Sequence, residues 1–198
     1  ALFAEDWLRR GREAGNLFNL SCRRAVQRQT RSILPNTVPH EPSFPTRRLA
    51  IGSPIELFLT APRDGYLTLI NPGTSGDFYL LTPNDNALDL RATAGRTLSS
   101  AELVPGVNLR QEPPEGQEYL VAFVTPTPLF TRAELEVDSA EGLSRECPYL
   151  SRRDGRPVPV QPMRHGAAAR VKAMERQLEG LPAGSWSVGF LRYLVVEA

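Results

Sequence analysis

The feature that most constrains the fold of this chain is the regular placement of proline directly after short apolar segments. Pro62, Pro72, Pro83 and Pro126 each follow a run that is rich in β-branched, aromatic or leucine side chains. Because proline has no backbone N–H, it is tolerated just past a strand but not inside one that pairs on both sides. Repeated breaks of this kind predict many short strands joined by turns rather than long helices.

Apolar residues alternate with polar ones within these segments, as they do in strands that bury one face. Ile55, Leu57 and Leu59 share one face of the first segment, and residues 185–197 form a final alternating strand. We therefore expect a mainly β fold over residues 51–198. The expected architecture is an antiparallel sandwich, either immunoglobulin-like or a half-open barrel.

Two later segments differ from the strands in composition and spacing. Residues 132–143 and 165–182 have the pattern of helices, and Val171, Met174 and Leu178 line one side of the second segment. We expect one or two C-terminal helices to pack on the β fold.

The N-terminal zone differs in composition, because residues 1–34 contain no proline. One amphipathic helix is expected to end at Gly15, and a second is expected over residues 16–34, so this zone is predicted to be a helical pair. Residues 35–50 are rich in proline and are interpreted as an extended connector to the β module at 51–198. Short amphipathic helices need a partner surface, so we expect the pair to be docked.

The charge balance excludes functions that depend on a strong overall field. The formal net charge is +1, so we expect neither nucleic acid nor an anionic membrane as a partner. Arginines in the N-terminal zone lack interleaved aromatic residues, and we interpret them as a solvated face or a protein contact. No apolar run reaches about 18 residues, so membrane insertion is not expected. Twenty-two arginines against one lysine indicate a GC-rich, bacterial coding history.

Side chains suited to catalysis or metal binding are few and scattered. The chain contains two histidines, His40 and His165, and two cysteines, Cys22 and Cys147, with no CxxC, HxH or HExxH pattern. A Cys147–His pair is formally open, but no tight turn surrounds this thiol to form an oxyanion site. Arginines near Cys22 would lower its pKa, yet its apolar neighbours favour simple packing as a buried free thiol. We therefore predict no catalytic residues, no cofactor and no metal ion.

Two further patterns look functional at first sight. The loop NPGTSGD has the glycines of a phosphate cradle, but it leads into a strand and lacks the lysine of a P-loop, so we interpret it as a hairpin loop. Asp77, Asp85 and Asp89 are close in sequence but lack the central glycine and terminal glutamate of a calcium loop. We interpret them as parts of Asx-rich turns.

The order of motifs in the β zone resembles a bacterial domain family of unknown function. The motifs are LAIGSPIELFLTAPRDGYLTLINPGTSGDFYLLTPN, then PPEGQEYLVAFVTPTPL, and finally SWSVGFLRYLVV. Domains of this family are appended to caspase-like peptidases, to secretion-associated kinases and to other multidomain proteins. The resemblance covers most of residues 51–198 and implies an accessory β module, with no catalytic residues to carry over.

Residues 1–45 are similar to the end of a bacterial caspase-like peptidase domain. The matching features are an Ala-Leu helix, an LF…RRAV…T helix and a proline-containing exit, the segment in which the chain leaves the domain. The catalytic His and Cys of such peptidases lie upstream of this point, so the resemblance implies that this chain lacks both. The usual Gln-Pro at the exit is replaced by ILPNTVP, and an unrelated helical hairpin is the alternative.

These observations favour a non-catalytic protein-recognition or accessory module of a larger bacterial protein, most simply the C-terminal part of a caspase-like peptidase. The alternative is a structural or assembly protein of a bacterial envelope or secretion apparatus. The expected partner is a protein, either the chain's own upstream domain or another polypeptide. The candidate partner-binding residues are Arg152, Arg153, Arg156, Val158 and Val160. The alternative for this stretch, which the sequence favours, is that it covers the edge of its own domain.

Overall fold

The computed structural model describes residues 2–24, 47–72, 78–83, 89–105, 107–111, 115–130, 145–152, 157–160 and 167–197. The strands are, in chain order, β1 (Leu17–Arg24), β2 (Arg47–Ala50), β3 (Pro54–Thr60), β4 (Gly65–Pro72), β5 (Phe78–Thr82), β6 (Arg91–Ala92), β7 (Thr97–Ser99), β8 (Val107–Arg110), β9 (Gly116–Thr125), β10 (Arg145–Arg152), β11 (Pro157–Val160) and β12 (Ser187–Val196). The helices are α1 (Leu2–Glu13), α2 (Ser100–Leu103) and α4 (Ala167–Glu179).

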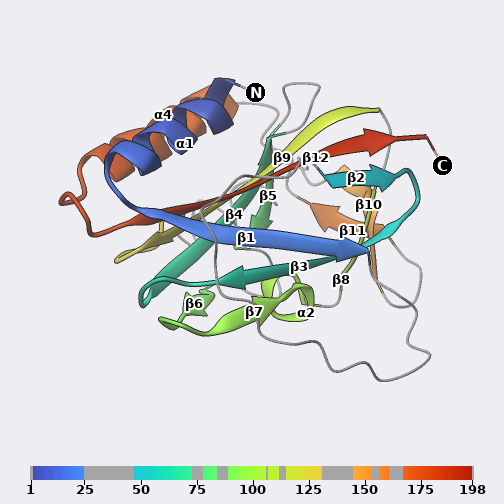
Figure 1. Ribbon diagram of the computed structural model, residues 1–198, viewed down its shortest axis with the longest axis horizontal. Coiled ribbons are helices and arrows are strands. Elements are labelled where there is room, and N and C mark those ends of the chain that lie inside the picture. Colours follow the sequence, from blue (N-terminus) through green and yellow to red (C-terminus); the bar gives the residue numbers. More distant parts are fainter. Residues whose placement is uncertain are drawn as a thin grey trace.

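The strands form one curled sheet, which confirms the mainly β prediction in its half-open barrel form (Figure 1). The strand order is β11-β10-β8-β3-β1-β12-β9-β4-β5, while β2, β6 and β7 pair beside β12, β4 and β3. The pairings are antiparallel except that β1 and β2 each run parallel to β12. The two ends of this order, β11 and β5, approach each other, but no ladder joins them in the described strands.

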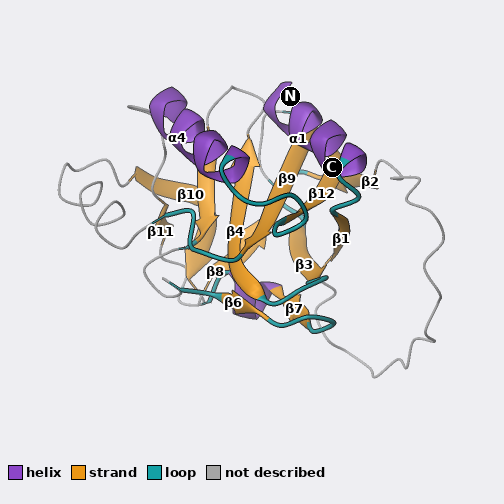
Figure 2. Cartoon of the chain, turned by 90° about the vertical axis from the view of Figure 1, so that its left-hand side faces the viewer, coloured by secondary structure: helices purple, strands orange, loops and turns teal. Residues whose placement is uncertain are grey.

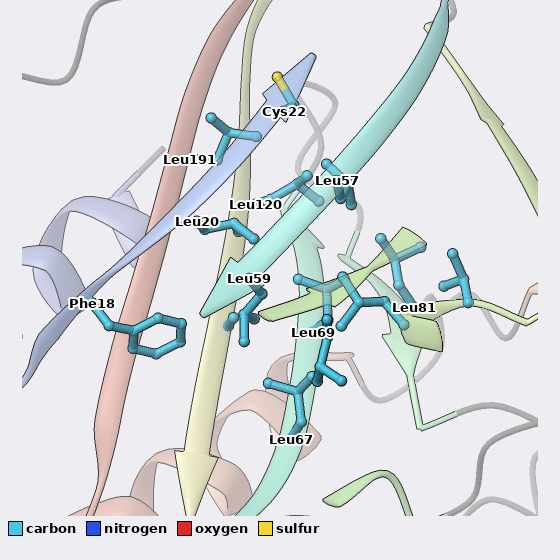
Figure 3. Close-up of a cluster of buried hydrophobic side chains, with 14 of the residues drawn as sticks. Phe18, Leu20, Cys22, Leu57, Leu59, Leu67, Leu69, Leu81, Leu120 and Leu191 are labelled. Carbon is cyan, nitrogen blue, oxygen red and sulfur yellow. The ribbon is translucent and has the colours of Figure 1, made fainter. Parts of the chain in front are cut away.

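The concave side of the sheet encloses an inner core made largely of leucine side chains (Figure 3). Leu57 and Leu59 of β3 are 1% and 0% exposed, and Ile55 packs against the same cluster, so the face predicted for this strand is confirmed. Leu67 and Leu69 of β4 contribute from the opposite part of the curl. Alternate residues of each strand point inward, so the curl of the sheet brings these rows together.

The convex side of the sheet carries an outer layer formed by α1 and α4, which lie over the central strands (Figures 1 and 2). Trp7 of α1 meets Phe123 and Trp186 edge-to-face, with ring centroids 5.3 Å and 5.6 Å away. Met174 and Leu178 of α4 are each 1% exposed, which confirms the predicted C-terminal helix and its buried side. The other helix predicted there, over residues 132–143, lies outside the described residues.

The predicted second helix of the N-terminal zone is wrong, because its residues 17–24 form strand β1. The first helix ends as predicted, and Gly15 then adopts the left-handed conformation with φ +65°. In β1, Phe18, Leu20 and Cys22 are buried while the residues between them are exposed. This alternation is the strand period, and β3 and β12 supply the hydrogen-bonding edges that a strand requires.

The predicted connector over residues 35–50 is described only at its end. Residues 25–46 lie outside the described part of the chain, and β2 begins at Arg47. The described N-terminal segment is thus part of the same sheet as the strands of the β module.

Candidate functional site

Polar side chains gather at one end of the inner face, beside the leucine core. Glu118 of β9 is 9% exposed and lies two residues before Leu120, so it points to the same inner side. The Nδ2 of Asn71 donates hydrogen bonds to Glu118 Oε2 at 3.2 Å and to the carbonyl of Tyr119 at 2.9 Å. Tyr193 of β12 lies directly opposite Glu118 in the register and is 5% exposed.

The pKa values of Tyr193 and of the neighbouring Cys22 are both raised. Burial raises the pKa of Tyr193, and the nearby Glu118 and Cys22 raise it further. Burial also raises the pKa of the Cys22 thiol, although the Arg47 guanidinium acts in the opposite direction. A phenol that keeps its proton is a hydrogen-bond donor, and a protonated thiol is a poor nucleophile. The described hydrogen bonds of this cluster join β4 to β9, and the raised pKa of Cys22 favours the protonated thiol.

No motif in the sequence marks Asn71, Glu118 or Tyr193 as a candidate site residue. The signal that would have found them is their phase: each occupies an inward position of its strand, where the neighbouring inward residues are apolar. A polar residue in such a row is informative, because burying it requires a hydrogen-bonding partner.

Cys22 is a free thiol that is 2% exposed, which confirms the predicted buried cysteine. Its predicted helical setting is wrong, because it lies in β1, where the Arg47 guanidinium donates to the Cys22 carbonyl. Cys147 lies in β10 opposite Val158 of β11, and both histidines lie outside the described residues. Within the described ranges, no three His, Cys, Asp or Glu residues come together in a way that would hold a metal ion.

A small hollow lies at one end of β4. It has a volume of about 10 Å³, which is room for roughly one water molecule. It is lined by Tyr66, Leu67, Thr68, Pro83, Leu90, Pro128, Leu129 and Phe130. A hollow of this size does not admit a substrate or an organic cofactor.

The Gly65-Tyr66-Leu67 motif at the start of β4 has a packing explanation. A Cβ on Gly65 would lie 2.6 Å from the carbonyl oxygen of Thr125, so only glycine allows β4 to approach β9 this closely. Tyr66 in turn lies beneath the Arg91 guanidinium, which is 4.5 Å from the ring centroid. The motif thus allows β4 to pair closely with β9. The glycine-rich loop that follows β4 lies outside the described residues.

The structure describes three of the five candidate partner-binding residues through their backbone. Arg152 ends β10 opposite Val107 of β8, while Val158 and Val160 lie in β11 opposite Cys147 and Arg145. Arg153 and Arg156 lie outside the described residues. The backbone topology places the described members at the β11 end of the sheet order.

The two prolines of β11 bear on what this edge can bind. Pro157 and Pro159 alternate with Val158 and Val160, and alternate residues direct their backbone groups to the same edge of a strand. Because proline has no N–H to give to β10, we expect both prolines to direct their nitrogens away from β10. The outer edge of β11 then presents carbonyl acceptors without donors, which agrees with the missing ladder to β5 among the described strands.

Comparison with known proteins identifies part of the β module. Residues 48–128 match the family model of a domain of unknown function, DUF4384. The predicted domain of unknown function is thus found over this range, which runs from β2 to just past β9. Curated proteins give no match, and solved structures give none either. Among the described helices, none combines the length and the apolar character needed to cross a membrane.

Proposed function

We propose that this chain is a non-catalytic protein-recognition or accessory module of a larger bacterial protein, the C-terminal part of a caspase-like peptidase. The observation that carries the proposal is the filled interior of the half-barrel. Leu59, Leu69, Ala122 and Val124 are each 0% exposed in that interior, and the hollow beside β4 holds roughly one water. A β module filled in this way meets other molecules at its surface.

The state of Cys22 supports the same proposal. A nucleophilic cysteine needs exposure and a lowered pKa, whereas Cys22 is buried and burial raises its pKa. A match to a domain family of unknown function over residues 48–128 adds no catalytic role. The proposed role is therefore contact with a partner protein rather than chemistry on a substrate.

The proposed contact surface is the β10–β11 end of the sheet, where the backbone places Arg152, Val158 and Val160. The candidates Arg153 and Arg156 come between these two strands in the sequence. The prolines of β11 weaken strand addition at its outer edge, so recognition would depend more on the arginines than on a backbone ladder. Three arginines within five residues of the sequence fit an acidic partner surface, because each guanidinium offers several donors to carboxylates.

The test is a calorimetric measurement of binding between this chain and the polypeptide encoded directly upstream in the same gene, made as a separate protein. We expect binding that a variant with Arg152, Arg153 and Arg156 all changed to Ala weakens about tenfold or more. A control variant with Lys172→Ala and Arg176→Ala, two exposed basic residues of α4, should bind like the unaltered chain. Absence of binding, or equal loss in both variants, would contradict the proposal.

A separate measurement tests the non-catalytic part of the proposal. The purified chain is incubated with a library of fluorogenic peptides, and no hydrolysis is expected. Turnover that disappears in Cys22→Ala or Cys147→Ala would show a catalytic thiol and overturn this part. An upstream leader or membrane anchor in place of a peptidase domain would instead favour an assembly protein.

A further inference from the structure

Strand β1 of the N-terminal segment Leu2–Arg24 lies in the middle of the strand order, although the segment precedes the matched domain. Strand β1 pairs with β3 through five residues, from Leu20 to Arg24, and with β12 through three, from Leu17 to Asn19. Helix α1 lies against the outer side of β12, as Figure 1 shows. The segment therefore contributes one strand, β1, to the sheet and one helix, α1, to the outer layer.

The strand order shows what this segment joins. In the described sheet, β1 is the strand that connects the group β8-β3-β7 to the group β12-β9-β4-β5. Without β1, the backbone groups of β3 from Ile55 to Leu59 and of β12 from Val188 to Phe190 would lose these pairings. Two such edges are a template for an added strand.

Side chains of the segment make specific contacts with the strands on which it packs. We call the position that the segment occupies on β3 and β12 the groove. Phe18 lies over Gly189 so closely that a Cβ there would be 2.4 Å from its ring. A Cβ on Gly11 of α1 would likewise be 2.4 Å from Val188. The segment thus packs with a matched shape on both sides of β12, as a bound peptide does in its groove.

Anchor residues reach both layers of the protein. Leu20 and Cys22 enter the inner core, while Ala4 and Trp7 enter the outer layer. Outside the apolar contacts, Tyr119 donates a hydrogen bond to Glu5 at 3.2 Å.

The covalent connection does not explain the position of the segment. The Arg47 guanidinium donates to the Cys22 carbonyl, so the end of β1 and the start of β2 lie close together. Yet 22 residues, 25 to 46, separate these strands in the sequence. At this separation in the sequence, the position of β1 follows from the strand pairings and side-chain contacts of the segment itself.

We infer that residues 47–197 form an acceptor for a helix–turn–strand peptide, and that Leu2–Arg24 is its tethered, exchangeable occupant. The groove takes a peptide with an aromatic residue on one helix face followed by a strand with alternating apolar residues. This inference is independent of the surface proposed at β11.

The test uses the full chain with a specific protease site inserted within residues 25–46. The folded protein is cut at this site, and the N-terminal piece is expected to stay bound during size-exclusion chromatography. A fluorescent synthetic peptide of residues 1–24 should then replace it with one-to-one stoichiometry, measured by anisotropy. The uncut chain should take up far less peptide, because its tethered segment competes at high effective concentration.

Single-residue variants of the peptide test whether uptake of the peptide depends on the contacts in the groove. Peptides with Leu20→Asp or Trp7→Ala should compete at least about tenfold more weakly than the native peptide, because one buries a charge and the other loses an anchor. The Arg12→Ala peptide, altered at an exposed position, should compete equally well. Failure of the labelled peptide to enter the cut protein, equal uptake by the uncut chain, or equal competition by Leu20→Asp would each overturn the inference.

Discussion

The inner core and the outer layer lie on opposite sides of the same strands but are built differently. Leucine dominates the inner core, and its residues come mainly from β-strands. The outer layer has aromatic side chains at its centre and depends on two helices that are far apart in sequence. Strands β9 and β12 contribute to both, so they are buried on both faces.

The difference shows how one sheet can serve two kinds of packing. Curling of the sheet creates the inner core without any other element, because inward rows from β3, β4 and β9 meet across the curl. The convex face cannot be covered in this way and needs helices. The inner core is therefore a property of the strands, and the outer layer is a property of how α1 and α4 dock.

The largest expected effect comes from removing the centre of the outer layer. Trp7→Ala should lower the free energy of unfolding by about 3–5 kcal/mol, because a side chain that is 1% exposed loses its packing against Phe123 and Trp186. Urea denaturation followed by circular dichroism measures this. Arg12→Ala on the exposed side of α1 is the control and should change little. A loss below about 1 kcal/mol for Trp7→Ala would mean that the outer layer contributes little.

A somewhat smaller loss is expected in the inner core. Leu59→Ala should cost about 2–5 kcal/mol, since this side chain is fully buried among other leucines. Combining it with Trp7→Ala tests whether the two layers are independent. Because the residues lie on opposite faces of the sheet, the two losses should add within about 0.5 kcal/mol. A larger coupling in denaturation experiments would show that the layers stabilise each other through the sheet.

The contact between Phe18 and Gly189 tests how tightly the inner core is packed where β1 meets β12. Gly189→Ala should destabilise by about 1–3 kcal/mol, because its new Cβ would lie 2.4 Å from the Phe18 ring. Adding Phe18→Leu should recover part of that loss in the double variant. If thermal denaturation shows no loss for Gly189→Ala alone, the ring has room to move and the packing is looser than described.

The smallest expected effect concerns the rim of the inner core, where α2 begins. The backbone N–H of Ser99 donates to Glu102 Oε2 at 3.0 Å, and this bond, followed by the charge and hydrogen bond of Arg96, lowers the pKa of Glu102 below its ordinary 4.5. The ionised carboxylate is thus the stabilising form. Its contribution should be present above pH 4.5 and disappear as the pH falls through the lowered value.

Glu102→Gln gives the corresponding measurement. The variant should be less stable than the unaltered chain at pH 7 by about 0.5–1 kcal/mol, the order of a helix cap, and the gap should close in acid. Denaturation curves at several pH values check this. A gap that is unchanged in acid would show that the carboxylate charge contributes nothing at this cap.

Much of the fold could be predicted from the strand patterns. Proline breaks and alternation located β3, β4, β5, β9 and β12, because these signals act within a few residues. The helix predicted over residues 16–34 is wrong because its apolar residues fit the helical period only when widely spaced positions are included. The shorter pattern Phe18, Leu20, Cys22 has the strand period, and its partners lie at the far end of the chain, where local sequence gives no information.

The candidate site could be predicted only in outline. The sequence marks Val158 and Val160 either as partner-binding residues or as cover for the domain's own edge, and the structure places both in β11, at one end of the described strand order. The polar cluster of Asn71, Glu118 and Tyr193 was missed, because it depends on which rows of three strands face inward. Such a juxtaposition requires the tertiary fold.

The position of β12 has a consequence for how the protein is made. Ribosomes release the chain from its N-terminus, so β1 and β3 are available long before β12, which follows every other described strand. Since β12 lies between β1 and β9, the sheet cannot be continuous until those last residues emerge. Any strands that pair before β12 emerges would therefore expose unpaired edges, and we expect nascent chains to be most prone to aggregation and to chaperone binding in that period.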